Sequence, residues 1–105
     1  MAYESGALDA TLAAAAGDDS ALMAELRGAF VESAERQLDL LSRARCDGNW
    51  HVAAMRLKGL AASFHAEELM VLADEALEAA PGEPTVLSRI DAHLAKFSAG
   101  NALSG

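Results

Sequence analysis

Histidine and cysteine residues, which serve both as nucleophiles and as metal ligands, are few in this sequence. They are the histidines His51, His65 and His93 and the single cysteine, Cys46. An unprotonated imidazole nitrogen can act as a nucleophile, so histidine chemistry is the first possibility to weigh. No two of the histidines are spaced for a shared metal ion, and a structural zinc site typically needs about four ligands. We therefore expect neither a metal site nor a cofactor.

One short segment in the middle of the chain is unusual for a helix. Residues 54–66 read AMRLKGLAASFHA, with apolar residues at helical spacing. A glycine in a helix interior costs about 1 kcal/mol relative to alanine, so Gly59 requires a reason. Close packing against a neighbouring helix is one explanation, and a functional surface is the other.

This segment resembles the signature of histidine-containing phosphotransfer (HPt) domains, the phosphoryl carriers of bacterial two-component phosphorelays. The family signature is Ala-His-x-Leu-Lys-Gly, followed by small residues and a Gly-Ala turn. The similarity extends over residues 8–98 and implies an antiparallel four-helix bundle with a short extra N-terminal helix. The residues that match the signature are Leu57, Lys58, Gly59, the small residues at 61–63, Phe64 and Ala66.

Two positions depart from the family pattern. Met55 stands where the family has its phosphoacceptor histidine, and His65 stands where the turn has glycine. A thioether forms no stable phosphoryl adduct, so we expect the standard transfer reaction to be absent at position 55. The resemblance implies that the lysine neutralises phosphoryl charge and that the glycine leaves room for the partner. The expected partner-binding surface comprises Met55, Arg56, Leu57, Lys58, Gly59 and Ala62. The alternative is a different rotation of the helix, in which Met55 fills the core.

His51 is the candidate phosphoacceptor if another histidine replaces the missing one. At about 100° per residue, it lies about 40° from Met55 and about 20° from Lys58 around a helix. The segment from Trp50 to the motif is also a few residues shorter than in the family. The helix could therefore be shifted by one turn relative to the family, which would favour His51 as the acceptor. The alternative is an exposed histidine without a role, about one turn (~5.4 Å) from the family's site. We expect His65 to cap a helix end and His93 to lie on the surface.

Three hypotheses about function follow. The leading one is a non-enzymatic HPt-like protein that binds a response-regulator receiver domain or a sensor histidine kinase, as a modulator or decoy. The first alternative is an active phosphotransfer protein that uses His51 and carries an acid-labile phosphoryl group. The second is a helical adaptor or dimer unrelated to phosphorelays, with an apolar patch buried between copies. Hydrolytic and redox enzymes are disfavoured, because the sequence has no Gly-rich phosphate loop, nucleophile elbow or paired-cysteine motif.

Composition and charge narrow the list of partners. The chain has 105 residues, 52% of them hydrophobic, and a formal charge of −8 at pH 7. Nucleic-acid binding depends on a basic face, so we expect this acidic chain to bind neither DNA, RNA nor anionic lipid. No apolar run approaches the ~20 residues of a membrane span, and the first residues lack a signal-peptide pattern. With the single cysteine, these features favour a reducing, cytoplasmic location.

Five helices are expected to position these residues. Ala, Leu and Glu are abundant and both prolines lie within 81–84, which is typical of an all-α chain. The spacing of apolar residues predicts helices over 8–16, from 20 to near Cys46, from Trp50 to about His65, from there to Pro81, and from Pro84 onward. The apolar face predicted for the third of these helices consists of Trp50, Ala53, Ala54, Leu57, Leu60, Ala61 and Phe64. We expect one domain over residues 8–99, with an N-terminal tail at 1–7 and a flexible C-terminal tail at 100–105.

The apolar stripe of the second helix fixes which of its sides faces the core. Acidic residues on its other side, Glu32, Glu35 and Asp39, are expected to face solvent. The stripe consists of residues that recur every three or four positions, namely Leu22, Leu26, Phe30, Ala34, Leu38 and Leu41.

Overall fold

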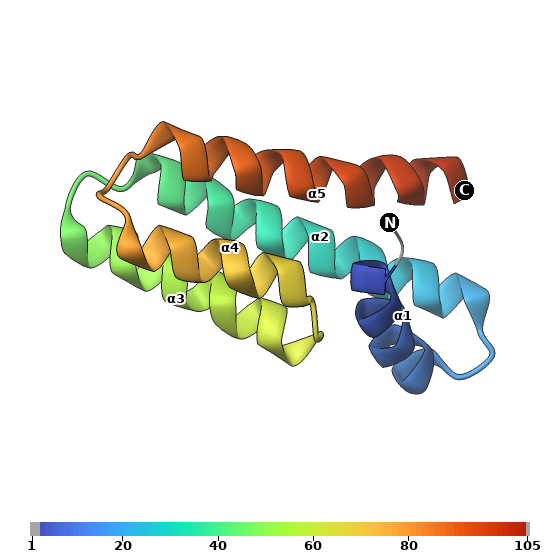
Figure 1. Cartoon of the computed structure of the whole chain (residues 1–105). Helices are drawn as coiled ribbons and strands as arrows, with labels where there is room; N and C mark the ends of the chain where they lie inside the picture. The colour runs from blue at the N-terminus through green and yellow to red at the C-terminus, as the bar shows by residue number, and fades with distance from the viewer. Residues whose placement is uncertain (1–2, 105) are drawn as a thin grey trace.

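The computed structural model describes the backbone of residues 3–104 and the side chains of residues 7–97. Within this range the chain forms only helices and the turns that join them, so the predicted all-α class is confirmed. The helices, shown in Figure 1, are α1 (Tyr3–Ala16), α2 (Ser20–Arg43), α3 (Asp47–Ser63), α4 (Glu67–Glu78) and α5 (Pro84–Ser104).

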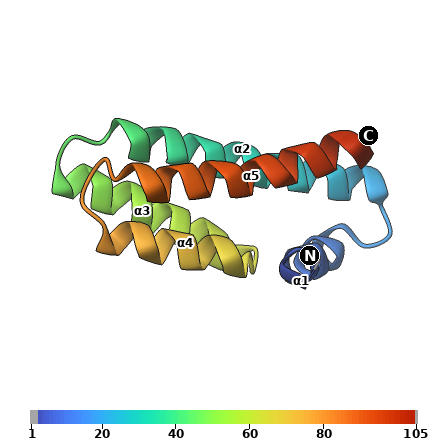
Figure 2. The same cartoon turned by 45° about the horizontal axis from the view of Figure 1, so that its top comes forward.

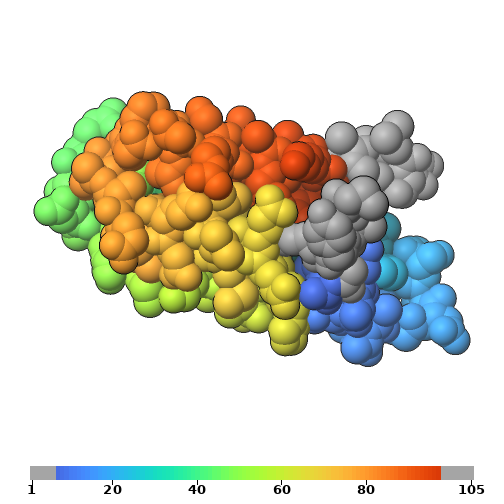
Figure 3. Space-filling view, viewed as in Figure 1, coloured from blue at the N-terminus to red at the C-terminus, as the bar shows by residue number. Residues whose placement is uncertain are grey.

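Helices α2 to α5 contact one another in a closed ring. α2 packs against both α3 and α5, and α4 packs against the same two helices. α1 lies across the end of this group, where it contacts α2 and α4 beside the turn that joins α3 to α4 (Figures 1 and 2). In Figure 3 the side chains of α4 and α5 meet on one face of the molecule. α3 contacts α2 and α4 but not α5 in the described part of the chain, so α3 and α5 lie diagonally across the ring from each other.

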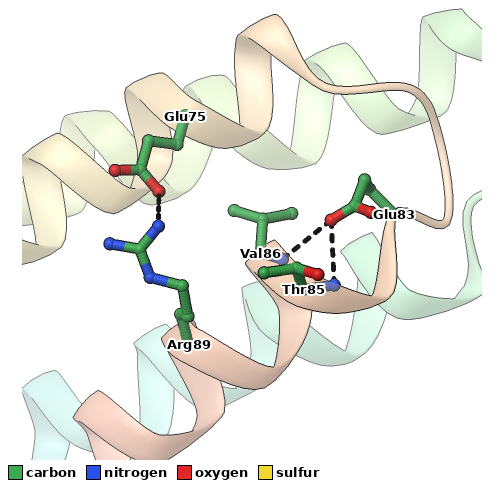
Figure 4. A network of polar contacts seen from close by, with 5 residues as sticks. All are labelled: Glu75, Glu83, Thr85, Val86 and Arg89. Atoms are coloured by element: carbon green, nitrogen blue, oxygen red, sulfur yellow. Dashed lines mark hydrogen bonds and ion pairs between the residues drawn. The ribbon is translucent and has the colours of Figure 1, made fainter.

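Specific side chains start two of the helices. The Asp19 carboxylate accepts a hydrogen bond from the Leu22 backbone N–H at 3.0 Å and caps α2. At the start of α5, Glu83 accepts from the backbone N–H groups of Thr85 and Val86, at 2.8 and 3.1 Å (Figure 4). Pro84 occupies the first helical position, where its missing N–H costs nothing.

Several helix boundaries differ from those predicted. α1 begins at Tyr3 and α5 continues to Ser104, so helix occupies much of the segments expected to be tails. α2 ends at Arg43, earlier than predicted, and α3 begins at Asp47 instead of Trp50. A glycine lowers helix stability by only about 1 kcal/mol, so glycines near both ends do not stop these helices. Residues 1, 2 and 105 of the expected tails lie outside the described residues.

The core is built from the apolar stripes that the helices turn toward one another. The rings of Phe30, Phe64 and Phe97 cluster at the end nearest α1, with the centroid of Phe30 5.0 Å from that of Phe64 and 6.1 Å from that of Phe97. Leu22, predicted to lie in the core, is 36% exposed because it sits in the first turn of α2. The largest fully buried side chains are Phe30, Leu8, Leu12, Leu41, Leu57, Leu69, Ile90 and Leu94.

Candidate functional site on the exposed face of α3

The buried residues of α3 set the rotation of the helix and thereby the position of Met55. Trp50 and Ala54 are buried one turn apart, and the Trp50 indole Nε1–H donates to the Ala76 carbonyl of α4 at 2.6 Å. Met55 lies on the opposite side, and its side chain is 46% exposed. Gly59 and Ala62, one and two turns further along the same face, are also exposed. Met55 is thus a surface residue, as predicted for the partner-binding face.

Leu57 does not belong to this surface. Its side chain is fully buried in the core between the helices, so it cannot contact a partner. The motif residue therefore serves to hold α3 in place. Its position, two residues after Met55, puts it about 160° away around the helix, which explains why the two side chains have opposite surroundings.

Lys58 and Arg56 extend the surface in different directions. The Lys58 Nζ atom lies 2.8 Å from the Asp74 carboxylate of α4, and both side chains remain partly in solvent. This ion pair turns Lys58 toward the α4 side of the exposed face. Arg56 is exposed, and it has no ion-pair partner among the side chains that the structure describes. The Arg56 guanidinium group is thus free to contact a partner on the side of Met55 that faces away from Lys58.

Gly59 is not required by the packing of the protein. A Cβ atom built at this position would have no atom within 4 Å beyond its own helical surroundings. Close approach of a neighbouring helix, one of the two explanations predicted from the sequence, is therefore excluded. The glycine leaves a flat, side-chain-free patch on the surface directly after Met55.

His51 is exposed near the start of α3, beside a depression of about 510 Å³ that Trp50, Leu77 and Pro81 also line. It shares a side of the helix with Lys58 but is seven residues earlier, about 10.5 Å along the axis. Since the Lys58 ammonium group is held by Asp74, the geometry does not bring Lys58 and His51 together. A phosphoryl group on His51 would lack the lysine that accompanies it in the family.

His65 terminates α3 in a left-handed backbone conformation. Its φ is +58°, the only positive φ of a non-glycine residue in the described part of the chain. Its backbone N–H bonds to the Ala62 carbonyl, and the Ala66 N–H bonds to the Ala61 carbonyl. These two bonds form a Schellman motif, in which glycine is the usual residue at this position. His65 thus lies at the helix end, but the bond to the helix carbonyl comes from its backbone and not from its imidazole.

The His65 side chain also makes a contact that the sequence did not reveal. Its Nδ1 atom lies 2.9 Å from the Thr11 hydroxyl oxygen. The Thr11 hydroxyl also lies 3.1 Å from the Ala7 carbonyl oxygen, and when its one proton is donated there, the imidazole Nδ1–H is the donor in the bond to Thr11. The bond ties α1 to the α3–α4 turn. No local pattern signals it, because the two residues are 54 positions apart in the chain.

His93, predicted to be a surface residue, is buried. Its side chain is 7% exposed and packs edge-on against Phe97, with ring centroids 5.0 Å apart. Its Nδ1 atom lies 3.7 Å from the Glu68 carboxylate of α4. The prediction failed because a histidine at this point of α5 lies on the same side of the helix as the buried Ile90 and Phe97. His93 therefore belongs to the core and lies apart from the exposed face of α3.

Three searches, for a metal-binding cluster and a membrane-spanning helix among the described residues and for similar proteins, each found nothing. Across residues 7–97, no group of three or more His, Cys, Asp or Glu side chains is arranged to hold a metal ion. No helix in the described part has the length and apolar character needed to cross a membrane. Comparison with protein-family models, curated proteins and solved structures finds no match.

Proposed function

We propose that this chain is an HPt-like domain without the standard phosphoacceptor, and that it binds a receiver domain or a sensor histidine kinase as a modulator or decoy. In this proposal α2 to α5 correspond to the antiparallel four-helix bundle of that family. Docking takes place on the face of α3 that carries Met55, Gly59 and Ala62. Because no imidazole stands at position 55, the bound partner keeps its phosphoryl group.

Gly59 is the observation that carries this proposal. It costs stability in the middle of α3, and no neighbouring atom needs the space that it leaves. A partner that must approach the helix closely does need that space. Met55, one turn earlier, supplies an adaptable apolar side chain at the centre of the same face. The left-handed backbone at His65, where the family has glycine, supports the same alignment.

The proposal is tested by placing a side chain on this flat patch. Gly59→Gln adds a good helix-forming residue, so the fold is retained, but the new side chain covers the surface beside Met55. We expect its affinity for a receiver domain encoded in the same genome to fall by about tenfold or more, as for other central interface positions. Isothermal titration calorimetry across the full set of such receiver and kinase domains provides the measurement.

Gly48→Gln is the matched control for this substitution. Gly48 lies in the first turn of α3 and is exposed, and a Cβ atom added there, as at Gly59, would have no atom within 4 Å. Binding that is unchanged in this control but weakened by Gly59→Gln supports the proposed face. Equal binding by both variants, or no binding to any receiver or kinase domain, refutes it.

Transfer through His51 is the second candidate, and the exposure of that side chain favours it. It requires an imidazole nitrogen to attack an aspartyl phosphate, which an exposed histidine can do. The two candidates differ in one observable, a phosphoryl group covalently attached to this chain. That observable is measured by mass, independently of binding affinity.

A further inference from the structure

A groove of about 270 Å³ runs between the C-terminal part of α2 and the first half of α3. It lies beside the face proposed above, on the side of α3 that is turned toward α2. Its apolar lining comes from Leu40 of α2, from Ala44 directly after α2, and from Val52 and Ala53 of α3. The groove is thus formed by two helices that the core already holds rigidly together.

Two large apolar side chains are exposed to solvent in this groove. Leu40 is 44% exposed and Val52 is 46% exposed, and both line the same groove. Met55, exposed to the same extent as Val52, follows it by one turn of α3. Exposed large apolar side chains that gather in one place, instead of being scattered singly, mark interaction sites.

The edges of the groove are cationic, although the chain as a whole has a formal charge of −8. Arg43 and Arg56 line it from α2 and α3. Arg43 pairs with Asp39 on its own helix at 3.2 Å but stays 75% exposed, and Arg56 has no ion-pair partner among the described residues. The groove therefore has two accessible guanidinium groups beside the apolar side chains of Leu40 and Val52. A ligand with an apolar centre and anionic edges matches this arrangement in both polarity and charge.

We propose that this groove binds an amphipathic helix of another protein, with an apolar face flanked by Asp or Glu side chains. Apolar residues at positions i and i+4 of such a helix cover Leu40 and Val52, and its carboxylates meet Arg43 and Arg56. This inference needs neither a receiver domain nor a phosphoryl group, so it stands or falls separately from the proposed function.

A pair of synthetic peptides tests the proposal with the full-length chain. Each is a helical peptide of about 18 residues with leucines on one face, long enough to form a helix in the groove. One peptide flanks the leucines with glutamates, and the other replaces every glutamate by lysine. We expect the acidic peptide to bind and the basic peptide to bind at least about fivefold more weakly, as measured by fluorescence anisotropy.

Variants assign the binding to the groove. Leu40→Ser is expected to weaken binding of the acidic peptide by about fivefold or more, while Val71→Ser, at a 56% exposed apolar residue of α4, leaves it unchanged. Arg56→Glu is expected to reverse the preference between the two peptides, a result that unfolding cannot produce. Equal affinity for both peptides overturns the proposal. So does a concentration-dependent dimer that Leu40→Ser dissociates, because the occupant is then a second copy of this chain.

Discussion

The left-handed backbone at His65 predicts opposite preferences between alanine and glycine at two positions, Gly59 within α3 and residue 65 in the turn just after this helix. At a regular helical position, alanine is more stable than glycine by about 0.5 to 1 kcal/mol, because glycine loses more backbone freedom on folding. Gly59 is such a position, with open space where a Cβ would lie. At position 65, with a φ of +58°, the order should be reversed.

The magnitude at position 65 follows from the contacts that each variant loses. Both His65→Ala and His65→Gly remove the exposed hydrogen bond to Thr11, worth about 0.5 to 1 kcal/mol. Only the glycine variant relieves the left-handed conformation, which costs an L-residue about 1 kcal/mol or slightly more. We therefore expect His65→Ala to be clearly destabilised and His65→Gly to be about 1 kcal/mol more stable than it.

Urea unfolding followed by circular dichroism measures both differences, with the free energy of unfolding taken from a two-state fit. Gly59→Ala is expected to raise the midpoint of thermal unfolding by about 2 to 8 °C, given about 4 to 8 °C per kcal/mol for a domain of this size. If His65→Ala proves as stable as His65→Gly, the proposed backbone strain at position 65 is wrong. The alignment of residues 65 and 66 with the Gly-Ala turn of the HPt signature then loses its support.

Three further predictions concern the residues that hold α3 and α1 in place, and chemical denaturation followed by circular dichroism checks each. Trp50→Phe removes the indole N–H that bonds to the Ala76 carbonyl and should destabilise the fold by about 1 to 3 kcal/mol; a neutral result would mean that this bond contributes nothing. Leu57→Ala should cost about 2 to 5 kcal/mol, whereas a cost below about 1 kcal/mol would place Leu57 on the surface after all. Arg27→Met breaks the partly exposed ion pair with Asp9 and should cost about 0.5 to 1 kcal/mol at low salt and less at high salt, and a loss that salt does not alter would contradict the ion-pair interpretation.

The helices of this chain were predictable because their apolar residues recur at helical spacing. Trp50, Ala53 and Ala61 were assigned to the buried side of α3 from that spacing alone, and they are buried. The exposure of Met55 could not be predicted in the same way, because it depends on the rotation of α3, which the packing against its neighbours sets. Helix ends were less predictable, since neither Gly48 nor Asn49 stops a helix once its following turns are packed.

The remaining features depend on contacts between distant parts of the chain. His93 sits in the apolar stripe of α5, but only the packing of α4 against α5 shows that it is buried beside Glu68. The bond between His65 and Thr11 likewise joins residues far apart in sequence. Leu57 was assigned both to the core and to the binding surface. Its burial decides between them, because a side chain on the inner side of α3 cannot reach a partner.

Binding without phosphoryl transfer is the central claim, and one experiment measures both parts of it. The chain is mixed with a phosphorylated receiver domain, complex formation is followed by size-exclusion chromatography, and the intact mass of the chain is then determined. We expect a complex and an unchanged mass, since a thioether at position 55 accepts no phosphoryl group. An acid-labile gain of about 80 Da that disappears in His51→Ala would contradict this claim and identify His51 as a working phosphoacceptor.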